Sequence, residues 1–135
     1  MEHLAIMDKE TIEKIMNGEK LIESRFSKHM ITPFRRVSVG DTVYLKVSSG
    51  DILATFEVGK VIYLEGLTRE KINDVSLRYG NLINAPIGYF DRKMGSSFGT
   101  LMYVKNPKWI LPTKISKKGR AAFVSAESIL KKFEV

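Results

Sequence analysis

Residues 38–67 constrain the fold more than any other part of the sequence. Apolar and polar residues alternate through "SVGDTVYLKVSSGDILATFEVGKVIYLEGL", which is the period of a half-buried β-strand. Turn residues interrupt the alternation at Val39-Gly40-Asp41 and again at Ser49-Gly50-Asp51. Glycine next to aspartate between two alternating runs is typical of a hairpin. The pattern predicts paired strands at 42–47 and 52–63.

A strand, a helix and a second strand are predicted before this hairpin. "HLAIM" reads as a short buried strand at 3–7. A helix follows over 8–18, with Asp8 as its N-cap and Gly18 at the position after its end. "KLIESRF" predicts a strand over 20–26, and the pattern breaks at the following proline of "MITPFRR".

The second half of the chain predicts a helix at 68–80, begun by Thr68 and ended by Gly80, and then a long irregular connection over 81–99. Strands at 100–105 and 108–115, a basic loop "SKKGR" and a short helix capped by Ser125 complete the chain. With 135 residues and no linker or repeat, the sequence predicts a single domain over 1–135. The fold class is α+β: a mostly antiparallel sheet that closes into a small β-barrel, with two or three flanking helices.

Composition excludes several kinds of chemistry. There is no cysteine, so disulfides, thiolate metal sites and cysteine nucleophiles are absent. Two histidines, His3 and His29, are too few for a histidine-based metal site, and we expect neither a metal nor a cofactor. No apolar run approaches ~18 residues and no signal sequence is apparent. We therefore expect a cytoplasmic protein without a membrane partner.

The charge is concentrated in the last third of the chain. The formal net charge is +7, yet residues 1–91 carry a net of −1 and residues 92–135 a net of +8. Basic residues clustered among aromatic ones are the electrostatic footprint of a polyanion partner. Trp109 is either a core residue or a stacking platform for a base. The predicted contacts to nucleic acid in this region are Lys105, Lys108, Trp109, Lys114, Lys117, Lys118 and Arg120.

A second candidate site lies at the start of the second predicted strand, in the run Gly18-x-Lys20-x-x-Glu23-x-Arg25. Glu23 and Arg25 are two residues apart and point to one face of a strand. Lys20 falls on the other face of a regular strand, but it stands at the junction with the helix, where Gly18 allows a bend. At a barrel mouth the three would form a polar cleft for phosphates and a base edge, or else an ion-pair cluster that closes the barrel end without a ligand.

This run resembles the G-x-K-x-x-E-x-R signature of the ASCH domain family, which belongs to the PUA-like superfamily of small β-barrels. All four fixed positions of the signature are present, and "GDILATFEVGKV" is similar to the barrel strands of the family. The resemblance covers residues 3–110 in order of elements. It implies a PUA-like barrel and an RNA or nucleotide-containing ligand, with Lys20 and Arg25 among the contacts.

The resemblance also implies two enzymatic alternatives. Some ASCH proteins hydrolyse N-acetylated cytidine with a Lys, a Thr and a Glu; Lys20 matches the first, but Glu23 stands at the Thr position and Asp74 only near the third. Other similar proteins cleave RNA, for which Lys20, Glu23 and Arg25 would be the catalytic set.

The sequence therefore predicts an RNA- or nucleotide-binding protein. The alternatives are a small hydrolase at the same cleft and, in another class, a protein–protein adaptor in a transcription or translation complex. The pattern does not predict the oligomeric state.

Overall fold

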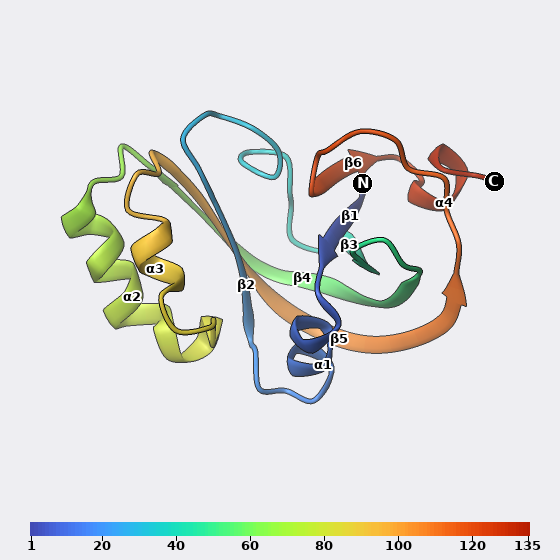
Figure 1. Ribbon diagram of the computed structural model, residues 1–135, viewed down its shortest axis with the longest axis horizontal. Helices are drawn as coiled ribbons and strands as arrows, with labels where there is room; N and C mark the ends of the chain where they lie inside the picture. Colours follow the sequence, from blue (N-terminus) through green and yellow to red (C-terminus); the bar gives the residue numbers. More distant parts are fainter.

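The computed structural model describes residues 1–135 as one curled sheet with four helices around it (Figure 1). The strands are β1 (Glu2–Met7), β2 (Ile22–Ser27), β3 (Thr42–Val47), β4 (Ile52–Glu65), β5 (Phe98–Thr113) and β6 (Phe123–Ala126). The helices are α1 (Lys9–Met16), α2 (Arg69–Ile83), α3 (Tyr89–Arg92) and α4 (Ile129–Lys132). This is the α+β class that the sequence predicts.

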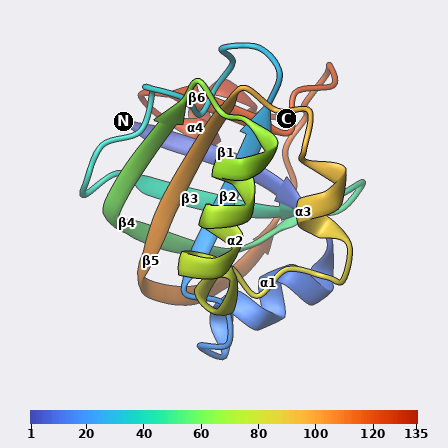
Figure 2. The same ribbon diagram turned by 90° about the vertical axis from the view of Figure 1, so that its left-hand side faces the viewer.

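The sheet runs in the order β2-β5-β4-β3-β1-β6. Neighbouring strands are antiparallel except β1 and β3, which are parallel. The predicted hairpin is confirmed as β3 and β4. The register shifts along β4 and β5, and such bulges increase the bend and twist of long strands. The sheet consequently curls into the half-barrel seen in Figure 2.

The two strands predicted at 100–105 and 108–115 are in fact one strand, β5. Asn106, which lies between them, has a left-handed backbone with φ 49°, yet the pairing with β4 continues past it. The length of β4 explains the difference, because it offers a partner on both sides of the irregularity. A local break in the sequence pattern therefore becomes a bend rather than an end.

The curl stops short of closure, and a side chain spans the remaining gap. β2 and β6 are the two edges of the sheet and do not pair with each other. Arg25 of β2 donates from one guanidinium nitrogen to the carbonyl of Ile6 (3.2 Å) and from another to the carbonyl of Ala122 (3.4 Å). Ile6 is the next-to-last residue of β1, and Ala122 directly precedes β6. We call the gap bridged by Arg25 the seam.

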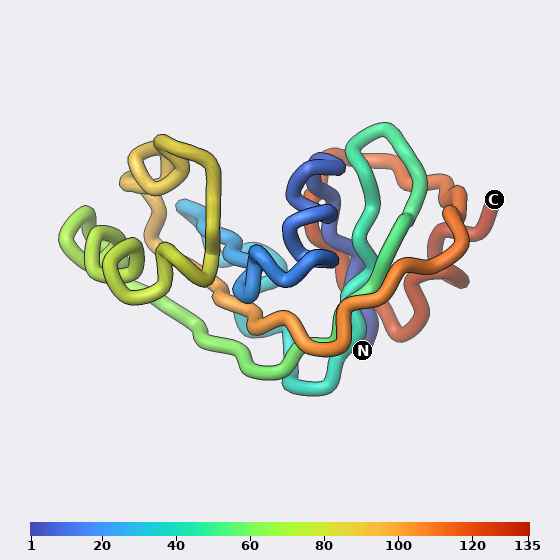
Figure 3. The backbone as a smooth tube through the Cα atoms, turned by 90° about the horizontal axis from the view of Figure 1, so that it is seen from below, coloured from blue at the N-terminus to red at the C-terminus, as the bar shows by residue number.

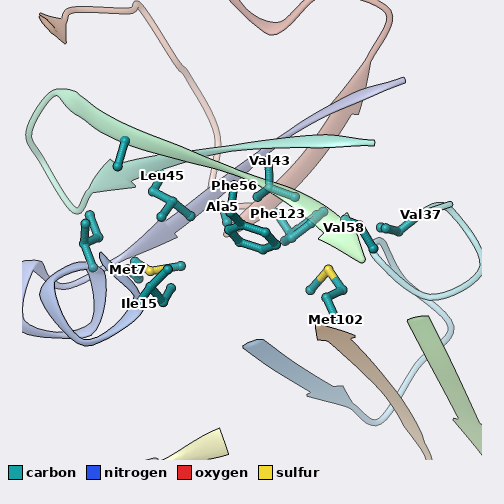
Figure 4. Close-up of a cluster of buried hydrophobic side chains, with 12 residues drawn as sticks. Ala5, Met7, Ile15, Val37, Val43, Leu45, Phe56, Val58, Met102 and Phe123 are labelled. Atoms are coloured by element: carbon teal, nitrogen blue, oxygen red, sulfur yellow. The ribbon is translucent and has the colours of Figure 1, made fainter. Parts of the chain in front are cut away.

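Two of the three apolar clusters join α1 and α2 to the sheet. The larger fills the inside of the curl, where Phe56 and Met102 of the sheet meet Ile12 and Ile15 of α1 (Figure 4). The smaller joins Ile22 and Leu101 of the sheet to buried residues of α2. As Figure 3 shows, α2 and α3 lie at one end of the molecule and α1 nearer its middle. No helix has the length and apolar character that crossing a membrane requires.

The helix boundaries are partly those predicted. The Asp8 carboxylate accepts from the amide of Thr11 (2.8 Å) and the Thr68 hydroxyl from that of Lys71 (3.2 Å), so both predicted N-caps are confirmed. The last cap is wrong, because Ser125 lies in β6 and Ser128 caps α4.

The predicted end of the second helix is also wrong. α2 runs through Gly80 and ends at Asn84, whose backbone is left-handed (φ 46°). Ile83 is fully buried in the smaller cluster, and its burial outweighs the ~1 kcal/mol cost of a helical glycine. The predicted irregular connection over 81–99 therefore holds the last turn of α2, the short helix α3 and the start of β5.

The C-terminus of α2 is attached to the junction between α1 and β2. The amide of Leu21 donates to the carbonyl of Leu82 (2.9 Å), and the Asn84 side chain donates to the carbonyl of Glu19 (3.0 Å). These contacts join residues more than 60 positions apart, and they place the end of α2 directly beside Lys20.

We expect Asn84→Ala to lower the free energy of unfolding by about 2 kcal/mol, because alanine resists the left-handed backbone and the contact to Glu19 is lost. Asn84→Gly should cost about 1 kcal/mol less, since glycine adopts this conformation freely. Denaturant unfolding of both variants measures the difference. Equal losses would show that the backbone conformation contributes nothing.

Candidate functional site

Lys20, Glu23 and Arg25 come together as the motif predicts. Gly18 has a φ of +83° and turns the chain after α1, and Lys20 precedes the first residue of β2, so strand alternation does not apply to it. Its ammonium lies 3.7 Å from one Glu23 oxygen, and the Arg25 guanidinium lies 3.1 Å from the other. The carboxylate is thus held between two cations.

This cluster is buried rather than superficial. Lys20 is 4% exposed and Glu23 5%. The Lys20 ammonium also donates to the carbonyl of Ile83 at 2.5 Å, and a cation at a helix C-terminus is favoured by the helix dipole. Burial is the largest influence on the pKa of Lys20 and lowers it, while the Glu23 carboxylate opposes that shift.

A cavity of about 650 Å³ adjoins the cluster at the seam. Lys20, Glu23 and Arg25 line it together with Ser24, although Ser24 points to the opposite face of β2 from Glu23. Because β2 is the edge of the sheet, the cavity extends around it and receives side chains from both faces. Aromatic rings of Phe34, Tyr89 and Phe123 form further parts of its wall.

A pair of hydroxyls stands on the outer face of β2. The Ser24 and Tyr89 hydroxyl oxygens are 2.8 Å apart, and the Tyr89 hydroxyl also lies 3.3 Å from the Ser24 carbonyl, to which it donates. Burial raises the pKa of Tyr89 to about 12, partly opposed by the hydrogen bond to Ser24. Tyr89 therefore stays protonated at neutral pH and acts as a hydrogen-bond donor.

The cavity is cationic. Its lining contains four cations, Lys20, Arg25, Arg92 and Lys93, against the two carboxylates of Asp8 and Glu23, a net of +2. Glu23 is shared by two of the cations, and Asp8 caps α1. A ligand with negative charge is therefore favoured over a neutral or positive one.

Residues 105–120 hold six basic residues and no acidic one, and we call them the basic segment. This segment adjoins the cavity only at its C-terminal end. Ala121 and Ala122 line the cavity, so the segment 114–120, which passes over the top of the view in Figure 1, leads to its rim. Lys114, Lys118 and Arg120 are exposed and Lys117 is half-buried.

Lys105, Lys108 and Trp109 lie away from the cavity, in the middle and C-terminal part of β5. None of the three lines the cavity. Trp109 is 53% exposed, so it is not a core residue.

Most of the lining residues were not predicted from the sequence, and three of these carry a charge or a hydroxyl on or next to α3. Tyr89, Arg92 and Lys93 belong to α3 or follow it, inside the stretch predicted to be irregular. The unusual length of that connection was the available signal, because long connections often carry function. Asp74, in contrast, lines a separate groove between α2 and the end of β4 and does not belong to this site.

Comparison with known proteins assigns the fold. No family model and no curated protein matches the sequence. The crystal structure of ASCH from Zymomonas mobilis matches with a TM-score of 0.73 and 11% identity, over 97% of this chain and 91% of that one. A serine-to-alanine variant of the same protein gives a TM-score of 0.74, also at 11% identity, over 97% of this chain and 92% of that one.

A hypothetical protein titled PH0355 is more distant, with a TM-score of 0.52 and 15% identity over 78% of this chain and 98% of that one. This chain therefore has the fold of the ASCH domain proteins, as the sequence motif implied.

We expect Lys20→Ala to lower the free energy of unfolding by ~3–5 kcal/mol, because it leaves Glu23 and the Ile83 carbonyl buried without this partner. The melting temperature should fall by roughly 10 °C or more. Glu65→Gln is the control: it removes the Arg35–Glu65 pair, whose side chains are 61% and 57% exposed, and should cost at most ~1 kcal/mol. Equal small losses in both variants would contradict the buried character of the cluster.

Tyr89 should titrate later than an ordinary tyrosine. Its raised pKa means that the folded state keeps the proton above pH 10, so the stability linked to it is complete below pH 10 and is lost as pH rises toward about 12. At pH 11 the folded protein and Tyr89→Phe should show the same tyrosinate absorbance. In guanidinium at the same pH they should differ by one tyrosine, and a difference of one in the folded state would contradict the shift.

Proposed function

We propose that this protein binds RNA or another nucleotide-containing ligand in the cavity at the seam. The proposal rests on one observation: a cationic cavity around Lys20, Glu23 and Arg25 adjoins the end of the basic segment. A nucleotide unit would enter the cavity, and the phosphates of a longer strand would follow residues 114–120.

The size and lining of the cavity support a nucleotide. Small-molecule sites measure ~300–1,000 Å³ and combine apolar walls with a few polar groups, and this cavity measures about 650 Å³. Aromatic rings such as those of Phe34 and Tyr89 suit the stacking of a base. Ser24, Thr100 and Lys20 also line this cavity, and their polar groups suit the hydrogen-bonding edge of a base.

The surroundings of the Glu23 carboxylate favour ligand binding over hydrolysis as the function of the cavity. A general base must reach the proton that it abstracts. One oxygen of Glu23 accepts from the Ser24 amide (3.1 Å) and lies next to Lys20, and the other accepts from Arg25 (3.1 Å). With both oxygens engaged by the protein itself, this carboxylate is suited to positioning the two cations.

We expect affinity for a short single-stranded RNA to fall as salt rises, with a log–log slope of about 0.7 per phosphate contact, because each contact releases condensed counterions. Changing Lys114, Lys117, Lys118 and Arg120 to glutamine should flatten the slope by up to ~3. Fluorescence anisotropy across a potassium chloride series measures both values.

A control variant changes Lys71 and Arg78 to glutamine, since these two cations lie on α2 in the separate groove. This control should leave the slope unchanged. Salt-independent binding, or the same slope in the quadruple variant as in the original protein, would contradict the proposal.

A further inference from the structure

One part of the cavity carries positive charge that no carboxylate neutralises. Arg92 and Lys93, at the end of α3, both line the cavity, and neither forms an ion pair or a hydrogen bond with a carboxylate. Asp91 directly precedes them in the sequence, but it does not line the cavity. Arg25 reaches the same cavity from β2 and shares its only carboxylate partner, Glu23, with Lys20.

Arg25, Arg92 and Lys93 are close enough for their charges to repel one another, and Lys93 also contacts Tyr89. The Lys93 ammonium lies 5.2 Å from the centre of the Tyr89 ring. Burial lowers the pKa of Lys93, and the like charges of Arg25 and Arg92 lower it further. Like charges that face one cavity repel each other, and an anion placed between them would relieve that repulsion.

We propose that Arg25, Arg92 and Lys93 form a subsite for a terminal phosphate group, that is, a phosphomonoester of a nucleotide. This inference rests on the proposed function, because it locates one end of the nucleotide that the cavity receives. The base then lies toward Lys20 and Glu23.

The charge balance selects a terminal phosphate over one within a strand. A phosphomonoester carries about −1.5 to −2 charges at pH 7, whereas each phosphodiester of a nucleic acid strand carries one. The net charge of the groups that line the cavity is +2, which a phosphomonoester dianion neutralises. The Tyr89 ring lies beside the subsite, with its centre 5.2 Å from the Lys93 ammonium.

Titration calorimetry with the four ribonucleosides and their 5′- and 3′-monophosphates tests the subsite. At least one monophosphate should bind at least ~10-fold more tightly than its nucleoside, the effect of one charge-assisted hydrogen bond. The double variant Arg92→Gln/Lys93→Gln should reduce that advantage to within about 2-fold. Its affinity for the nucleoside should not change, which also verifies that the variant is folded.

The control is Lys71→Gln/Arg78→Gln, which removes the same number of cations from the separate groove on α2 and should keep the full phosphate advantage. A nucleoside that binds as tightly as its monophosphates would overturn the subsite and leave the proposed function standing. So would an advantage that survives in the Arg92/Lys93 variant. No binding of any nucleoside or nucleotide, and none of RNA, would overturn the proposed function and the subsite with it.

A last comparison identifies the source of the phosphate. A pentaribonucleotide with a 5′-phosphate and the same strand with a 5′-hydroxyl are titrated in parallel. A gain of ~10-fold or more for the phosphorylated strand supports the end of an RNA as the ligand. A gain confined to the mononucleotides supports a free nucleotide, and the absence of a gain in both comparisons overturns the subsite.

Discussion

The Lys20 ammonium is the contact on which the arrangement of this protein depends most. It connects the carbonyl of Ile83, at the C-terminus of α2, to the Glu23 carboxylate on β2. Glu23 in turn holds Arg25, and Arg25 spans the seam to the ends of β1 and β6. One chain of charged side chains, buried at Lys20 and Glu23, thus runs from α2 to the far edge of the sheet. Such a chain is stable only when each member keeps its partner.

The cavity exists because the sheet does not close. A ladder of hydrogen bonds between β2 and β6 would fill the seam, whereas the single side chain of Arg25 leaves space on both sides of itself. Every buried side-chain nitrogen and oxygen of the protein has a hydrogen-bond partner. The residues that line the proposed binding cavity therefore also hold the fold together, whereas Arg92 and Lys93 are the lining cations that form no ion pair.

The sequence motif predicted more of the site than of its surroundings. The clustering of Lys20, Glu23 and Arg25 follows from local rules, since two residues of a strand share a face and Gly18 turns the third toward them. The burial of the cluster does not follow from these rules. It results from the C-terminus of α2, which arrives from more than 60 residues away and covers Lys20.

Local patterns alone determined the hairpin of β3 and β4, the caps of α1 and α2 and the α+β class, because alternation and capping involve only neighbouring residues. Long-range packing decided the rest. Burial of Ile83 extends α2 beyond Gly80. Pairing with β4 joins the two predicted strands into the single strand β5. The curl of the sheet brought α3 and residues 121–122 to the same cavity as β2. Proximity between segments so distant in sequence depends on the sum of all pairings, which no single segment encodes.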